Sequence, residues 1–277
     1  MKTILIPVDF SETSTNAIKF AADLSRDAAV KKIILLKSFY TSVYEQILPT
    51  PDFLQISAED IETEREEIVS QLATVSRKLL NRCNETIEVE TIISTEPVLR
   101  AIYQAIADRQ PDLLIVGSDA PGEVSMVGEQ IIEVVKTSAV KVMVIPANAS
   151  YHKIEQAVVP CDFEAVARLG LLQGLNNSHS WLNPKLMVLY VDPKNKHIGR
   201  EVEYEAAVKK LVNCYDCKLY YSGAKDTVKG ILDFARDNHA QLIIALPGKH
   251  SFFYNLTHSS ITDALSFNAK HPVLILK

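Results

Sequence analysis

The strongest constraint on the fold is that the chain repeats itself. Three segments recur in the same order, at offsets of 153, 129 and 131 residues: Ile4–Phe10 as Ala157–Phe163, Asp112–Val116 as Gln241–Ala245, and Val142–Ile145 as Val273–Leu276. A repeat of this kind indicates two copies of one domain. We therefore predict two tandem domains, at residues 1–148 and 152–277, of which the second is the shorter.

Each copy alternates short runs of β-branched residues with amphipathic helical patterns, which is typical of a parallel sheet covered by helices. We expect strands at residues 3–8, 33–39, 86–93, 112–117 and 141–145 in the first copy, and at 155–160, 185–191, 217–222, 241–246 and 272–276 in the second. Right-handed crossovers between them predict two doubly wound α/β domains. Each domain is then a five-stranded parallel sheet in the order 3-2-1-4-5 with helices on both faces, and its ligands bind at the carboxyl ends of the strands.

The first copy also shows where its helices begin. Ser11 or Thr13 can cap the first helix, and residues 59–80 form a longer amphipathic helix. Pro97 lies early in the next helix, where its missing N–H costs nothing. We expect the second copy to repeat this helical pattern.

Composition excludes several classes of protein. Hydrophobic residues make up 47% and charged residues 23% of the chain, as in ordinary globular proteins. No apolar run is long enough to span a membrane, and the first segment reaches Asp9 and Glu12 too early for a signal peptide. The four cysteines form no disulfide framework. We therefore expect a reduced, cytoplasmic protein with no membrane partner.

The charge of the chain is divided unevenly. Its net value of −5 argues against nucleic acid as a partner, because binding to phosphates rests on Lys and Arg. Residues 1–150 carry a net −8 and residues 151–277 a net +3. Such charges attract the two copies weakly to each other and favour an anion in the second.

The residues at the strand ends resemble a known family. Pro7–Glu12, the long segment after the second strand, Gly117 at the end of the fourth strand, and the Gly128-led helix before Val142–Pro146 are similar to the universal stress protein family. The resemblance covers essentially the whole chain, as a tandem member, and implies ATP or AMP as the candidate ligand. It places the candidate ligand-binding positions at Pro7, Val8, Asp9, Ser38, Val116, Gly117, Gly128 and Glu129 in the first copy, and at Pro160, Asp162, Val191, Gly248, Lys249, Ser259 and Ser260 in the second.

The phosphate loop of the first copy departs from the family pattern. The nucleotide-binding branch resembles Gly-x2-Gly-x9-Gly-Ser/Thr, in which glycines let the backbone approach the phosphates. Gly117 and Gly128 take the outer places, but Ala120 replaces the middle glycine and Glu129 the hydroxyl. Residues 118–129 contain three acidic residues and no Lys or Arg, so they repel a triphosphate. We expect no ATP in this loop.

The loop of the second copy departs differently. Leu246, Lys249 and Ser259 stand at the glycine places, although Ser260 keeps the hydroxyl. The segment is basic through Lys249, His250 and His258, and bulky through Phe252, Phe253, Tyr254 and Leu256. We expect a packed loop without ligand; an anion, where one binds to this chain, should bind here.

Asp9 and Asp162 each follow the first strand of a copy. The resemblance places them beside the nucleotide base, whereas the residues alone equally favour capping of the next helix. Both interpretations stay open here. Pro7 and Pro160 are expected to shape the strand ends.

One further motif needs an interpretation. Cys214 and Cys217 form a CxxC, but it closes a helix and enters a strand, whereas a thioredoxin-like site opens a helix. We interpret these as buried or incidental thiols, with a reversible redox pair as the alternative. The chain contains no Walker A, HExxH or G-x-S-x-G motif.

These patterns predict a non-enzymatic, stress-associated protein that acts through its conformation or through an unidentified partner protein, with degenerate nucleotide-binding loops. The alternative is an enzyme that binds ATP or AMP and slowly hydrolyses or transfers the adenylate. Catalysis needs a complete phosphate loop with a general base or a cationic clamp, and neither copy has one.

Two apolar segments predict the assembly. The last strands, Val142–Ile145 and Val273–Leu276, aggregate unless they are covered. The resemblance implies dimers across this strand, so we expect the two copies to pair here within one chain; a homodimer is the other assembly considered. The apolar segment 41–58 is predicted to fold over the first sheet or onto the neighbouring copy.

Overall fold

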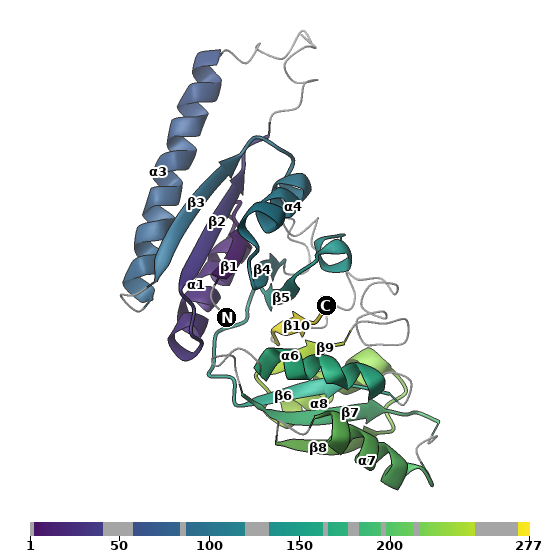
Figure 1. Cartoon of the computed structure of the whole chain (residues 1–277). Helices are drawn as coiled ribbons and strands as arrows, with labels where there is room; N and C mark the ends of the chain where they lie inside the picture. Colours follow the sequence, from purple (N-terminus) through teal and green to yellow (C-terminus); the bar gives the residue numbers. More distant parts are fainter. Residues whose placement is uncertain are drawn as a thin grey trace.

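Ten strands form one continuous sheet in the structure, a computed structural model that describes residues 3–40, 58–83, 87–119, 133–162, 166–176, 183–194, 198–212, 216–246 and 271–277 (Figure 1). The strands are β1 (Thr3–Pro7), β2 (Lys32–Ser38), β3 (Glu88–Ser94), β4 (Leu113–Ser118), β5 (Lys141–Pro146), β6 (Gln156–Pro160), β7 (Lys185–Val191), β8 (Cys217–Ser222), β9 (Leu242–Ala245) and β10 (Val273–Ile275). Each one begins and ends within two residues of its predicted range.

The strand order is β3-β2-β1-β4-β5-β10-β9-β6-β7-β8. Within each half all neighbours pair parallel, which confirms two doubly wound α/β sheets in the order 3-2-1-4-5. At the centre β5 and β10 pair antiparallel, with Leu274 opposite Met143. The two halves therefore share one sheet, and this pairing is its single antiparallel step among the described strands.

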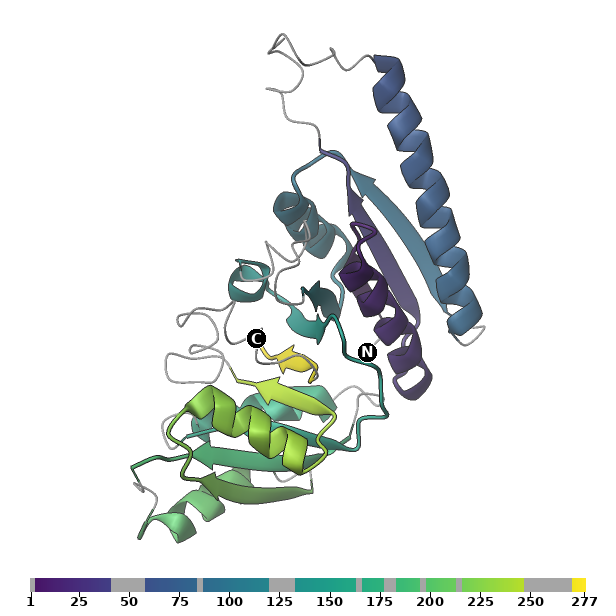
Figure 2. The same cartoon turned by 180° about the vertical axis from the view of Figure 1, so that it is seen from behind.

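The helices are α1 (Glu12–Asp27), α3 (Ala58–Arg82), α4 (Val98–Arg109), η1 (Val166–Leu172), α6 (Gln173–Asn176), α7 (Glu201–Leu211) and α8 (Thr227–Asp237). One face of the sheet packs against α1, α3, η1, α6 and α7. The other packs against α4, α8 and a helical turn at residues 133–137 (Figures 1 and 2). Alternate strand residues point to opposite faces, as Leu5 and Ile6 do, and each of the two cores extends across both halves. None of the described helices is long and apolar enough to cross a lipid bilayer.

The two halves differ most at their first helix. Ser11 is the N-cap of α1, and its Oγ accepts a hydrogen bond from the amide of Ser14 at 3.1 Å, which confirms one of the two candidate caps. The second half has a 3-10 helix, η1, and one turn of α-helix in place of the sixteen-residue α1. The expectation that the second copy repeats the helical pattern was therefore wrong at this element.

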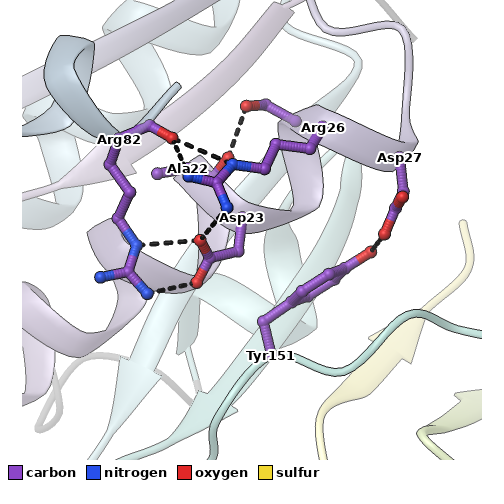
Figure 3. Close-up of polar contacts among 7 residues, drawn as sticks. Ala22, Asp23, Arg26, Asp27, Arg82 and Tyr151 are labelled. Carbon is purple, nitrogen blue, oxygen red and sulfur yellow. Dashed lines mark hydrogen bonds and ion pairs between the residues drawn. The ribbon is translucent and has the colours of Figure 1, made fainter. Parts of the chain in front are cut away.

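A polar cluster fastens α1 to α3 and to the segment between the two halves (Figure 3). The guanidinium of Arg82 donates two hydrogen bonds to the carboxylate of Asp23, at 2.9 and 2.6 Å. Arg26 donates to the carbonyl oxygen of Arg82. The hydroxyl of Tyr151 donates to Asp27 at 2.5 Å, and its ring packs edge-on against Phe20. The last turn of α1 thereby holds the connecting segment in place.

We predict that Tyr151→Phe lowers the free energy of unfolding by about 1 kcal/mol, because it removes the hydrogen bond to the carboxylate of Asp27 and keeps the ring. Urea unfolding of the full chain measures this loss. Tyr40→Phe is the matched control, since Tyr40 is half exposed, and should change stability by less than about 0.5 kcal/mol. Equal losses in the two variants would contradict the assigned role of Tyr151.

The same pair predicts a pH dependence. Burial, reinforced by the hydrogen bond to Asp27, raises the pKa of Tyr151 above its usual value. Above about pH 10 the unfolded chain therefore loses a proton that the folded chain keeps, so stability falls as the pH rises. In Tyr151→Phe this fall should be shallower, as measured by unfolding midpoints from pH 8 to pH 11.

Candidate functional site

The candidate site in each half lies where the first two parallel strands end. The amide of Val8 donates to the carbonyl of Leu36 at 2.8 Å, and the amide of Cys161 donates to Leu189 at 2.9 Å. Pro7 and Pro160 end β1 and β6 at matching positions in the register. Because the two backbones correspond here residue by residue, differences between their side chains show what each half can bind.

Asp9 positions the start of α1. Its Oδ1 accepts hydrogen bonds from the amide of Ser11 at 3.1 Å and from the hydroxyl of Ser11 at 2.5 Å, and Ser11 in turn caps the helix. Two interpretations were left open for Asp9, contact with a nucleotide base and capping of the next helix. The structure shows Asp9 in the turn that caps α1. Asp162 lies at the corresponding place in the second half, and residues 163–165 after it are outside the described part of the chain.

A lysine that sequence reasoning missed lies beside this turn. Lys37 is only 9% exposed, and its ammonium lies 5.1 Å from the centre of the Phe10 ring, a cation–π contact. Burial lowers the pKa of Lys37, while the nearby carboxylates of Asp9 and Glu64 oppose this effect. Phe10 itself has a left-handed backbone, with φ of 65°, which is costly for a bulky residue. One feature of the sequence could have indicated the burial of Lys37: it directly follows the apolar run of a strand that is buried on both faces.

The remaining positions of the first half serve its own structure. Ser38 is buried and its hydroxyl donates to the carbonyl of Glu96 at 2.7 Å. Val116 is fully buried in β4. At Gly117 a Cβ atom would lie 2.6 Å from Cγ2 and 2.7 Å from the carbonyl oxygen of Thr13. Gly117 therefore lets the first turn of α1 pack directly on β4, and this packing alone accounts for a glycine there.

The second half fills the corresponding space. Leu246, which stands where the first half has Gly117, is fully buried in the same core cluster as Leu169 and Leu172 of η1. A leucine at this position adds a side chain where the first half has only the hydrogen of Gly117, and the helix that follows β6 is the irregular η1 rather than a counterpart of α1. Val191 is half buried at the end of β7.

Aromatic residues hold the end of β6. The hydroxyl of Tyr204 donates to the carbonyl of Cys161 at 2.6 Å, and its ring contacts those of Tyr190 and Tyr221. Burial raises the pKa of the Cys161 thiol to about 12, and burial also raises the pKa of Cys217. Neither is the low-pKa thiol that redox chemistry requires.

Several predicted positions lie outside the described residues: Gly128, Glu129, Gly248, Lys249, Ser259, Ser260, Cys214 and most of the segment 41–58. The predictions made for them stay predictions. Among the described residues no group of three or more His, Cys, Asp or Glu side chains could hold a metal ion.

The sequence profile of the universal stress protein family matches residues 1–146. The chain belongs to the universal stress protein family. A universal stress protein from Archaeoglobus fulgidus is similar in structure along the whole length, with a TM-score of 0.65, 15% identity, and coverage of 99% of this chain and 98% of that one. A putative universal stress protein from Pseudomonas aeruginosa matches with a TM-score of 0.55 and 12% identity, covering 99% and 92%. At these identities the likeness shows a shared fold. No curated protein sequence matches the chain.

We predict that Gly117→Ala lowers the free energy of unfolding of this universal stress protein by about 1–3 kcal/mol, because the new methyl group meets the backbone of α1. Gly223→Ala is the control, since nothing lies within 4 Å of a Cβ atom there. Thermal and urea unfolding of both variants measure the difference. Equal stability of the two would show that Gly117 has no packing role.

Proposed function

We propose that this universal stress protein acts without catalysis, through the conformation of its two joined halves or through a partner protein. The observation that carries the proposal is the engagement of polar groups at the strand ends with the protein's own backbone. Asp9 binds Ser11, Ser38 binds the carbonyl of Glu96, and Tyr204 binds the carbonyl of Cys161. A catalytic site instead aims a base or a cationic clamp at its substrate.

An adenine nucleotide, ATP or AMP, is the ligand we propose for regulation of this protein, with the second half as the place where it binds. The second half has a net charge of +3, and its segment after β9 includes Lys249, His250 and His258. The corresponding segment of the first half is acidic. Charge therefore favours an anion in the second half. We place the protein in the cytoplasm, where it meets such nucleotides.

The proposal predicts binding without turnover. The full-length chain, titrated calorimetrically with ATP and with AMP, should bind in a salt-dependent manner, and Lys249→Glu should weaken binding at least tenfold, since it reverses a charge near the phosphates. Native mass spectrometry of the purified protein should detect any nucleotide that co-purifies. Incubation with ATP should release phosphate no faster than a protein-free blank.

Lys37→Met is the matched control, because it removes the buried cation of the first half and keeps an unbranched side chain of similar length. It should leave nucleotide affinity unchanged. Loss of binding in Lys37→Met but not in Lys249→Glu would place the ligand in the first half. Steady ATP hydrolysis by the full chain would overturn the non-enzymatic role.

A further inference from the structure

A groove lies between α4 and the edge strand β3 in the first half, with a volume of about 330 Å³. Its floor is apolar and is formed by Leu36, Ile92, Ala101 and Ala105. Its rim is polar and includes Ser94, Glu96, Gln104 and Asp108. The groove lies on the sheet face opposite to α1 and α3, so it is separate from the contact between Lys37 and Phe10.

The second half fills the corresponding place with aromatic rings. Leu36 pairs with Ile92 in the first half, and Leu189 pairs with Tyr220 in the second, so Tyr220 stands where Ile92 does. A left-handed residue follows each helix, Gln110 directly after α4 and His239 two positions after the last residue of α8. Counting back from these, Phe234 stands where Ala105 does. The rings of Tyr220 and Phe234 are in contact, with centroids 5.1 Å apart.

The same framework therefore exists once with two aromatic side chains between helix and edge strand, and once with Ile92 and Ala105 there. The two smaller residues leave the groove. A volume of about 330 Å³ is at the lower end of the range for small-molecule sites and is large enough for an aromatic side chain. Comparison with the second half thus indicates that an aromatic group fits the groove of the first half.

The position of β3 in the sheet indicates that the groove can receive its aromatic group from a peptide. In the described sheet β3 pairs with β2 on one side and is the terminal strand of the order. A terminal strand offers backbone N–H and C=O groups to an extended peptide, whose alternate side chains then point to one face. When such a peptide pairs with β3, its side chains on the same face of the sheet as Ile92 lie next to α4.

The charge around the groove defines the partner further. Glu96 and Asp108 lie on the rim, and Glu96 pairs with Arg100 at 3.4 Å, which leaves Asp108 as the main acidic charge there. The one basic rim residue, Arg109, donates to Glu90 at 3.0 Å, and the same carboxylate also pairs with Lys32 at 2.8 Å. The surrounding copy has a net charge of −8. A basic peptide is therefore attracted to this region, and an acidic one is repelled.

We propose that the groove between α4 and β3 binds an extended, basic peptide segment of a partner protein, which pairs with β3 and inserts an aromatic side chain above Ile92 and Ala105. This inference rests on the partner-binding role proposed above and names its surface. Buried aromatic side chains are frequent anchors of protein interfaces. The inserted ring takes the place that the second half gives to Tyr220 and Phe234.

Selection of a random heptapeptide library on the full-length protein tests the proposal. The control is the double variant Ile92→Tyr/Ala105→Phe, which copies the second half and fills the groove from within. Its thermal unfolding midpoint and circular dichroism spectrum establish that it folds. We expect enrichment of peptides with an aromatic residue flanked by Lys or Arg, and at least tenfold weaker binding of the strongest peptide to the filled variant.

A second variant, Asp108→Lys, keeps the groove open and reverses a rim charge, so it should weaken binding several-fold and reduce its salt dependence. The proposal is overturned when no peptide is enriched, when enriched peptides lack an aromatic residue, or when the filled variant binds them equally. ATP hydrolysis by the full chain would overturn the non-enzymatic role and leave these binding results unaffected.

Discussion

The antiparallel pairing of β5 with β10 is the contact on which the rest of the molecule depends. Val142, Met143 and Val144 face Ile275, Leu274 and Val273 across it, and all six are buried. Without it each half would expose an apolar strand edge, which is prone to aggregation. Because the pairing makes one sheet of ten strands, the two cores extend through both halves. The ammonium of Lys277 adds a contact across this boundary by donating to the carbonyl of Val135 at 2.5 Å.

The two halves share the same backbone arrangement but carry different side chains at corresponding positions. The register is shared closely enough for Lys37 to correspond to Tyr190, and Gly117 to Leu246. In the first half these positions hold a buried cation beside Phe10 and a glycine against α1. In the second they hold an aromatic cluster and a buried leucine. A repeated fold therefore supplies a comparison within one molecule, in which each substitution is tested against the same framework.

Much of the fold was predictable from the sequence because strands buried on both faces are continuous apolar runs. This signal located the eight inner strands, whereas the outer strands β3 and β8 are only partly buried and were predicted from the alternation of strand and helix patterns in each copy. η1 was not predicted, because the local sequence after β6 resembles that after β1, while the residues that its buried side chains meet in the core are distant in sequence. Lys37 was missed for a similar reason: its cation–π partner, Phe10, lies on another segment of the chain, and the pattern of a single strand does not reveal such a partner. Asp9 remained ambiguous because capping and ligand binding require the same carboxylate at the same place.

The division of charge and bulk between the halves gives each a distinct chemistry within one rigid sheet. The first half is acidic and has a groove beside its terminal strand, while the second is basic and fills that place with Tyr220 and Phe234. Each half ends the shared sheet at its own outer strand, β3 or β8, so the two outer edges face away from the central pairing. The peptide partner proposed for β3 and the anion proposed for the second half lie on different surfaces. The two proposals therefore do not require competition for the same residues.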